Sequence, residues 1–178
     1  GEALDFAHGQ GIIHRDIKPE NVVIGEYGEV YLLDWGIAVE LDDEGRYLAA
    51  NFSGTPAYSA PEMVSRRPTL DIRTDVYLMG ASLFQVLSGT PPHQGDDLHA
   101  VLDAVLTNPT PRLGKEIPGT LVSICQRSMA ANPADRYPSI RGLLEDIRYY
   151  LDNGEMAELN SQCNVEFTRL ENLAAAGD

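Results

Sequence analysis

The second part of the chain, from about Pro61 onward, carries apolar residues at helical spacing. Residues three or four positions apart share one helix face, so each such stripe predicts an amphipathic helix packed on a core. Gly89 follows the first stripe where a C-cap belongs, Asp96 or Asp97 is the expected start of the second, and Ser139 is a candidate N-cap for the fourth. The stripes are Val76, Met79, Gly80, Leu83 and Leu87; Leu98, Val101, Leu102 and Val105; Leu121, Ile124, Cys125 and Met129; and Ile140, Leu143, Leu144, Ile147 and Leu151.

The first third of the chain predicts mixed structure. Residues 2–8 indicate a helix that the following glycines stop. Two short apolar runs, 21–24 and 30–33, flank a turn-rich spacer and predict a β-hairpin. Residues 34–60 show little periodicity, which is typical of a functional or disordered loop. The pattern as a whole predicts a mainly α fold with a small β-hairpin.

The end of the chain carries one more helical stripe, made of Leu159, Cys163, Phe167, Leu170 and Ala174. Two interpretations are open: a helix that packs back on the body, or a linker helix that leads to further sequence. The chain starts at Gly1, in the middle of a pattern and without an initiator Met. We therefore expect it to be a piece of a longer protein.

The amino-acid composition and net charge of the chain limit the classes of molecule that it is expected to bind. The chain has 178 residues, 43% of them hydrophobic, which suits one globular domain with one core. Its formal net charge of −14 repels nucleic acid and anionic lipid, so neither is expected as a partner, whereas basic peptides are attracted. No apolar run approaches the length of a membrane span. Cys125 and Cys163 lie far apart with no CxxC motif, which favours a reducing, cytoplasmic location.

The segment from His14 to Asn21 is the most informative for chemistry. It places Asp16, Lys18 and Asn21 in a loop before an expected strand. A carboxylate can accept a hydroxyl proton, a lysine can neutralise a transferring phosphoryl group, and an asparagine carbonyl can bind Mg²⁺. Asp34, thirteen residues beyond Asn21, could bind the same ion. The pattern suits phosphoryl transfer.

Five motifs occur in the order found in the eukaryotic-like (Hanks-type) Ser/Thr protein kinases. The chain resembles the C-terminal lobe of such a kinase, and a bacterial origin is expected. With each fixed position matched by chance roughly one time in twenty, their joint occurrence is not coincidence. The resemblance covers about residues 1–151 and leaves 152–178 as a helical extension or linker. The motifs are H-R-D-x-K-P-x-N at 14–21, Asp34-Trp35-Gly36 in place of D-F-G, G-T-P-x-Y-x-A-P-E at 54–62, D-x-x-x-x-G at 75–80 and N-P-x-x-R at 132–136.

The resemblance implies an ATP- and Mg²⁺-dependent enzyme. Asp16 is then the catalytic base and Lys18 the contact to the γ-phosphate. Asn21 and Asp34 are implied as Mg²⁺ ligands, and Val23 is expected beneath the adenine ring.

Further roles follow from the same resemblance. Thr55 is expected to bond the catalytic Asp and Lys, and Glu20 to face a basic residue of a protein substrate that carries Ser or Thr. Scaffold roles are implied for the remaining motif residues. These are His14 and Trp35 in the hydrophobic column, Glu62 with Arg136 as a buried ion pair, and Asp75 bonded to backbone near the catalytic loop. His8, His93 and His99 show no ligand spacing and are interpreted as surface or packing residues.

The segment before Gly54 departs from the pattern. In the family, the arginine at position 15 clamps a phosphate of this segment, yet Ser53 is the only Ser or Thr between residues 35 and 54. Two hypotheses follow. One of the acidic residues at 42–44 (Asp42, Asp43 or Glu44) replaces the phosphate, or the segment is ordered without phosphorylation.

The family's N-terminal lobe, with its Gly-rich loop and strand lysine, has no match in this chain. We therefore expect the chain by itself to transfer phosphate barely, if at all, and the lobe to be supplied by the same polypeptide. A non-catalytic pseudokinase-type module or scaffold is the alternative, which intact Asp16, Lys18, Asn21 and Asp34 disfavour. A small-molecule kinase is disfavoured by the close match at 54–62.

Overall fold

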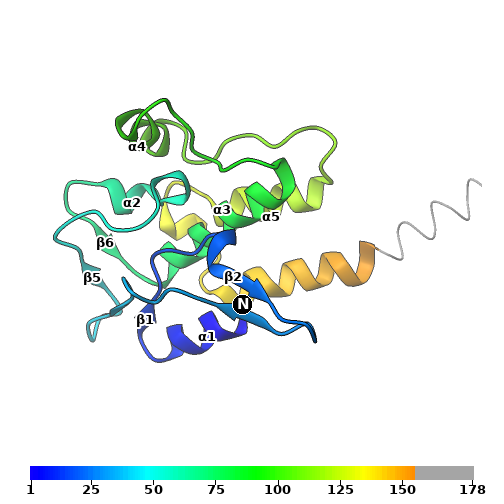
Figure 1. The fold of residues 1–178 in the computed structure, drawn as a ribbon, viewed down its shortest axis with the longest axis horizontal. Coiled ribbons are helices and arrows are strands. Elements are labelled where there is room, and N and C mark those ends of the chain that lie inside the picture. The colour runs from blue at the N-terminus through cyan, green and yellow to red at the C-terminus, as the bar shows by residue number, and fades with distance from the viewer. Residues whose placement is uncertain (155–178) are drawn as a thin grey trace, which may run out of the picture. The chain divides into compact units, whose positions relative to one another are not determined.

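The computed structural model describes residues 1–154, drawn in colour in Figure 1. The chain divides into two compact units, residues 1–144 and 145–178. The first unit contains every candidate site residue of the sequence analysis. In the second, residues 145–154 complete a helix that begins at residue 140. The stripe from Leu159 to Ala174 lies outside the described residues.

Helix α3 (Ile72–Ser88) is the central element of the first unit (Figure 1). The side chain of Asp71 accepts a bond from the Arg73 amide, and Thr74 completes a capping box at the start of the helix. Gly89 ends the helix with φ of 80°, so the predicted C-cap is confirmed. The helix begins four residues before the first apolar residue of its stripe, because the capping box and not hydrophobicity sets that end.

The other predicted helices also form. Helix α4 (Leu98–Thr107) starts at Asp97, whose carboxylate accepts from the Ala100 amide at 2.8 Å. Helix α5 (Gly119–Ser128) packs on α3 at Gly80, where an added Cβ would lie only 2.5 Å from Ser128 Cβ. Ser139 caps the helix over 140–154 with a bond from the Gly142 amide. Local caps and periodicity therefore predicted these elements correctly.

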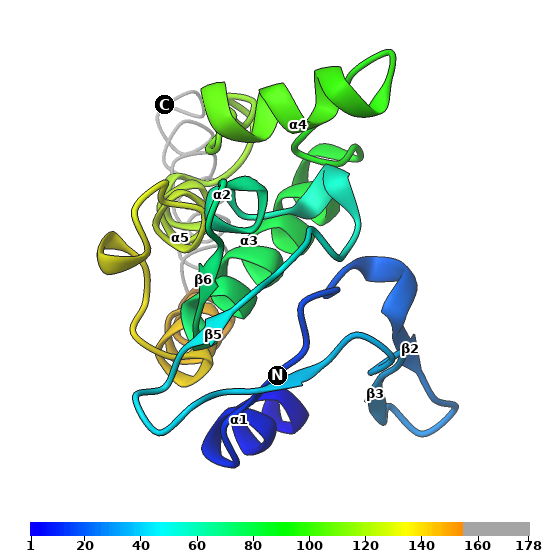
Figure 2. The same cartoon turned by 90° about the vertical axis from the view of Figure 1, so that its left-hand side faces the viewer.

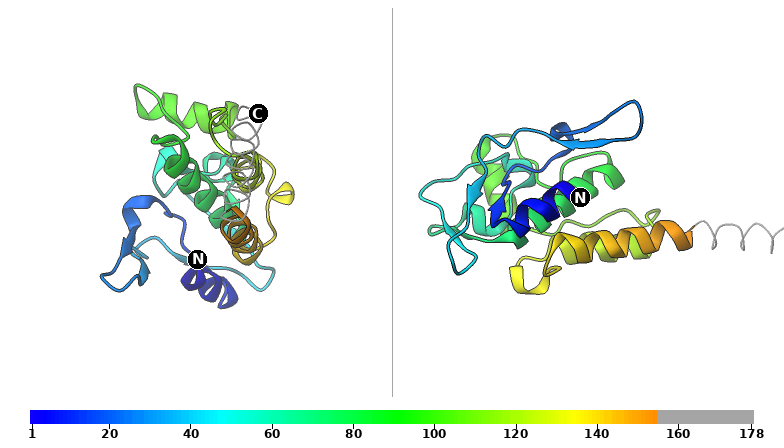
Figure 3. Two further views of the ribbon diagram at one scale, coloured as in Figure 1. Left: turned by 90° about the vertical axis from the view of Figure 1, so that its right-hand side faces the viewer. Right: turned by 90° about the horizontal axis from the view of Figure 1, so that it is seen from below.

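The N-terminal part contains the predicted helix and hairpin. Helix α1 (Glu2–Gly9) is followed by β1 (Ile12–Ile13), which pairs antiparallel with β4 (Val39–Glu40). Strands β2 (Val22–Ile24) and β3 (Val30–Leu32) form the hairpin. Figures 2 and 3 show the turn of this hairpin projecting away from α3, whereas β3 contacts α1.

The segment over residues 34–60, predicted as irregular, contains short ordered elements. Strand β5 (Tyr47–Leu48) pairs antiparallel with β6 (Thr69–Leu70), which follows the short helix α2 (Pro61–Val64). The 3₁₀ turn η2 (Pro56–Tyr58) packs on α4. A two-residue strand has no readable period, so the sequence pattern could not reveal the β5–β6 pair.

The core of the first unit gathers around α3 and the strand β1. The fully buried apolar side chains are Leu4, Ile13, Ile17, Ala60, Val76, Tyr77, Leu78, Ala81, Val105, Met129, Ile140 and Leu143.

Within residues 1–154, no helix is long and apolar enough to cross a membrane.

Candidate active site

The loop that carries Asp16 is held from α3 by one buried carboxylate. Asp75 accepts bonds from the backbone amides of His14 at 2.8 Å and Arg15 at 2.9 Å. His8 Nε2 lies 2.8 Å from the same carboxylate, and the Asp75 side chain is fully buried. Arg15 has φ of 69°, a left-handed conformation that arginine rarely adopts. The Asp75 bonds therefore fix a strained backbone immediately before Asp16.

Asp16 is the centre of a small polar network. Its Oδ1 accepts from the Thr55 hydroxyl at 2.6 Å and from the Thr55 amide at 2.9 Å. Lys18 Nζ lies 3.0 Å from Asp16 Oδ2 and donates to Thr55 Oγ1 at 2.7 Å. The three side chains come from positions up to 39 residues apart, and the fold joins them in one cluster.

The environment of Asp16 keeps the carboxylate ionised. Burial by itself raises the pKa of Asp16, whereas the hydrogen bonds from Thr55 and Lys18 and the Lys18 charge lower it. The second group of effects is larger, so the pKa of Asp16 lies below its ordinary value. At neutral pH the side chain is therefore a hydrogen-bond acceptor.

Gly54 allows the segment that carries Thr55 to approach the Asp16 loop. Its φ is 121°, and an added Cβ would lie 2.9 Å from the Arg15 carbonyl oxygen and 3.0 Å from Met63 Cε. A side chain at this position would push Thr55 away from Asp16. The sequence motif contained this glycine, but its reason is visible only in the close approach of the two loops.

Asn21 ends the 3₁₀ turn η1 (Pro19–Asn21) and joins the same network. Its Nδ2 donates to the Asp16 carbonyl at 2.8 Å and to Asp16 Oδ2 at 3.3 Å. Because the nitrogen faces Asp16, the amide oxygen faces away from it. That oxygen is the atom with which Asn21 could bind a cation.

Asp34 lies at the end of the hairpin, one residue beyond a backbone hydrogen bond to Asn21. The Leu33 amide donates to the Asn21 carbonyl at 2.8 Å, so Asp34 follows directly after a bond to Asn21. Asp34 is exposed and has φ of 59°. Its Oδ1 accepts from the Gly36 amide at 3.4 Å. A carboxylate and an amide oxygen are both ligand types that suit Mg²⁺.

His14 and Trp35 pack against each other edge to face, with ring centroids 4.6 Å apart. The Trp35 indole N–H donates to the Leu32 carbonyl at 3.0 Å, which satisfies the polar atom that phenylalanine lacks. His14 Nε2 donates to the Leu33 carbonyl at 3.0 Å, and His14 Nδ1 accepts from the Asp16 amide at 3.2 Å. The buried His14 ring thus connects the Asp16 loop with the hairpin.

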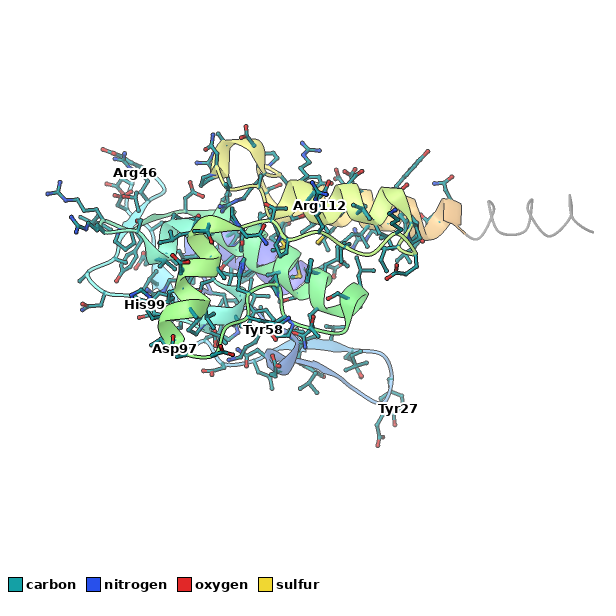
Figure 4. The ribbon with its side chains drawn as sticks, turned by 90° about the horizontal axis from the view of Figure 1, so that it is seen from above. Tyr27, Arg46, Tyr58, Asp97, His99 and Arg112 are labelled. Atoms are coloured by element: carbon teal, nitrogen blue, oxygen red, sulfur yellow. The ribbon has the colours of Figure 1, made fainter. Side chains whose placement is uncertain are left out.

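The hairpin exposes an unusual amount of apolar surface. Val23 is 44% exposed, Ile24 72% and Tyr31 53%. Figure 4 shows Tyr27 at its tip, directed away from the rest of the structure, and this side chain is 89% exposed. Such a surface is typical of a face that a ligand or another part of a protein covers.

Arg15 contacts a backbone carbonyl and an aromatic ring in place of the acidic residues that the sequence analysis offered as substitutes for a phosphate. The guanidinium donates to the Ile37 carbonyl and lies over the Tyr47 ring, 5.2 Å from its centroid. The acidic residues are engaged within their own turn. Asp42 accepts from the amides of Glu44 and Arg46, and the Glu44 carboxylate pairs with the Arg46 guanidinium. Asp42 and Glu44 are thus engaged within their own turn and not at Arg15. The hypothesis that an acidic residue at 42–44 replaces a phosphate at Arg15 stays a prediction.

Sequence reasoning missed a polar contact beside Glu20. The Tyr58 hydroxyl donates to Glu20 Oε1 at 3.3 Å and also hydrogen-bonds the Gln85 side chain. Burial and the Glu20 charge raise the pKa of Tyr58 to about 12. The tyrosine therefore stays neutral and keeps its hydroxyl proton. No local signal connects three residues from η1, η2 and α3.

A buried ion pair fixes α2 to the C-terminal part of the first unit. Arg136, which follows the 3₁₀ turn η3 (Pro133–Asp135), donates from both terminal nitrogens to Glu62, at 2.6 and 2.7 Å. The Arg136 side chain is fully buried, and its other bonds go to backbone carbonyls. The pair holds the chain that follows Thr55, and Glu62 also accepts from the Thr74 hydroxyl at 3.0 Å.

The histidines named in the sequence analysis occupy three environments. His99 is exposed, His8 is half-buried and hydrogen-bonded to Asp75, and His93 is buried and hydrogen-bonded to Tyr77. Within residues 1–154, no group of three or more His, Cys, Asp or Glu side chains could hold a metal ion. The candidate Mg²⁺ ligands, one carboxylate and one amide, form a smaller set of a different kind. Cys163 lies outside the described residues.

Comparison with known proteins assigns the chain to a family. Residues 1–146 match the protein kinase domain. The chain is 38% identical over 158 residues to a probable serine/threonine-protein kinase PknB of Bifidobacterium longum, covering 85% of the chain and 23% of that protein. It is 41% identical over 140 residues to serine/threonine-protein kinase PknE of Mycobacterium tuberculosis, covering 77% and 24%. The chain therefore belongs to the protein kinase family and is homologous to bacterial Ser/Thr kinases. It spans about a quarter of the length of these relatives.

Proposed function

We propose that this chain is the C-terminal lobe of a protein Ser/Thr kinase domain that transfers the γ-phosphate of ATP to a hydroxyl of a protein substrate. We assign the lobe to residues 1–151. A helical extension or linker is proposed for 152–178, most of which lies outside the described residues. The observation that carries the proposal is the cluster in which Thr55 and Lys18 hold the Asp16 carboxylate ionised beside Asn21.

Asp16 orients the substrate hydroxyl and accepts its proton as phosphate is transferred. General base assistance of this kind contributes typically ~10²–10⁴ in rate. Lys18 already lies in the cluster, and its ammonium group neutralises charge on the transferred phosphoryl group. Thr55 holds both side chains in position through its hydroxyl.

Asn21 and Asp34 are the proposed ligands of Mg²⁺. The metal, when bound, neutralises charge on the ATP phosphates. The residues fit this role, because the Asn21 amide oxygen faces away from Asp16 and the Asp34 carboxylate is exposed at the end of the hairpin. Both provide oxygen atoms, which Mg²⁺ prefers.

The exposed apolar hairpin supports the placement of the nucleotide. Val23 is proposed to lie beneath the adenine ring. We expect the N-terminal lobe of the complete kinase domain to cover the rest of this surface, as burial of exposed apolar side chains is favourable.

Glu20 supports a preference for basic residues near the acceptor Ser or Thr. It is exposed, and it lies beside Tyr58 in the segment that follows Thr55. The net charge of −14 adds a general attraction for basic peptides.

The test is a kinase assay of a protein that carries the complete domain, with Asp16→Asn as the variant and Asp43→Asn as the matched control. We expect wild type and the Asp43 variant to phosphorylate a basic protein substrate and the Asp16 variant to lose nearly all activity. Equal activity in wild type and Asp16→Asn would remove Asp16 from its role. A wild type that binds ATP without transferring phosphate would instead favour the non-catalytic module.

A further inference from the structure

The Arg15 side chain is a buried cation whose partners carry no charge. Arg15 is only 7% exposed, and its guanidinium donates to the Ile37 carbonyl. The Tyr47 ring covers it, with the guanidinium carbon 5.2 Å from the ring centroid. An aromatic face attracts a cation, and the attraction is strongest where water is excluded.

The Tyr47 ring is held in place by backbone pairing. Tyr47 pairs with Leu70, which is 2% exposed, and the Ala49 amide donates to the Pro68 carbonyl at 2.9 Å. Leu48, the residue after Tyr47 in β5, is 71% exposed. Successive side chains of a strand point to opposite faces. Tyr47 therefore covers Arg15, whereas Leu48 points to the other face of β5.

The sequence close to Tyr47 has no Ser or Thr that could be phosphorylated. Residues 35–52 contain neither amino acid, and Ser53 is the only one between residues 35 and 54. The nearby carboxylates of Asp42 and Glu44 are bonded within their own turn. Within the described contacts, the aromatic face of Tyr47 and the Ile37 carbonyl are therefore the groups that stabilise the Arg15 charge.

We propose that Tyr47 is a positioning residue, whose ring holds Arg15 and so keeps the segment over residues 37–54 ordered without phosphorylation. The inference rests on the proposed kinase function. Arg15 has a left-handed backbone and directly precedes Asp16. A guanidinium that loses its aromatic cover would seek water or another acceptor, and this movement would displace the Asp16 carboxylate from Thr55.

The experiment compares Tyr47→Leu, Tyr47→Phe and the neighbouring control Leu48→Ala. Hydrogen exchange on the 178-residue chain follows the Ala49 amide, and kinetics are measured in a protein with the complete kinase domain. For Tyr47→Leu we expect about tenfold faster Ala49 exchange, about tenfold lower kcat, and a KM for ATP within about twofold of wild type. Tyr47→Phe and Leu48→Ala should stay near wild type in all three measurements.

Two results would overturn the inference. The first is a kcat within about twofold of wild type for Tyr47→Leu, since the ring would then not act on Asp16. The second is a loss in Tyr47→Phe as large as in Tyr47→Leu, since the hydroxyl and not the ring would carry the effect. A wild type without phosphoryl transfer would contradict the proposed function instead. The Ala49 exchange rate would then decide by itself whether the ring holds the segment.

Discussion

The Thr55 hydroxyl donates to the Asp16 carboxylate at 2.6 Å, across 39 positions of the chain. The bond joins the loop proposed to perform the chemistry to the segment proposed to receive the peptide. Lys18 also donates to the Thr55 hydroxyl oxygen, so Thr55 contacts both Asp16 and Lys18. Thr55 is thus the residue through which the segment that follows Gly54 contacts Asp16.

Replacing Thr55 with Val should impair the proposed reaction and change its pH dependence. The hydrogen bond lowers the pKa of Asp16, so its loss should raise that pKa and move the acid limb of the kcat/KM profile to higher pH. We expect kcat to fall about tenfold, as for the loss of a hydrogen bond to a charged group. Thr55→Ser keeps the hydroxyl and should retain both values. An acid limb that stays in place in the Val variant would contradict the prediction.

Gly54→Ala should reduce both stability and activity. Its φ of 121° and the contact with the Arg15 carbonyl make a side chain costly, by about 1–3 kcal/mol in the free energy of unfolding. The matched control is Gly45→Ala, which has φ of 73° but nothing within 4 Å of an added Cβ. That variant should lose about 1 kcal/mol and keep its activity. Urea unfolding and kinase assays measure the two effects, and equal activity losses would refute the distinction.

Glu62→Ala should be strongly destabilising. The change leaves the fully buried Arg136 guanidinium without its counter-ion, which costs about 3–5 kcal/mol in the free energy of unfolding. Glu26→Ala, at an exposed position in the hairpin, should change that free energy by less than about 0.5 kcal/mol. Denaturant unfolding of the chain measures both. A loss below about 1 kcal/mol for Glu62→Ala would show that Arg136 finds another acceptor.

His93 should make stability fall in mild acid. The Tyr77 hydroxyl donates to the Pro109 carbonyl, so His93 Nε2 donates to Tyr77, and the buried Nδ1 has no hydrogen-bond partner among residues 1–154. Burial lowers the pKa of His93 to about 4, whereas an unfolded histidine takes up a proton below about 6.5. The unfolded state therefore binds more protons between these values, and stability decreases as pH falls through that window, by up to about 3 kcal/mol.

The control for this prediction is the exposed His99. Unfolding free energies of His93→Phe should depend less on pH between 4 and 6.5 than those of wild type. His99→Gln should retain the full dependence, because an exposed histidine titrates alike in both states. The same slope in all three proteins would assign the effect to other groups.

Much of the fold could be predicted because its signals are local. Asp97 and Gly89 bound their helices through bonds to residues only a few positions away. The hairpin follows from two apolar runs and a short turn, whose ends meet without help from the rest of the chain. The motif around Asp16 indicated phosphoryl transfer because its residue types and spacing serve that chemistry.

The amino-acid sequence alone thus determined the helices, the hairpin and the identity of the chemical groups. The tertiary structure decided which of these groups touch. Arg15 turns to Ile37 and Tyr47 and not to the acidic turn, and β5 pairs with a strand 22 positions away, because only the folded backbone brings such distant segments together. Side-chain partners across these distances depend on packing and competing bonds, and neither leaves a period or a spacing in the sequence.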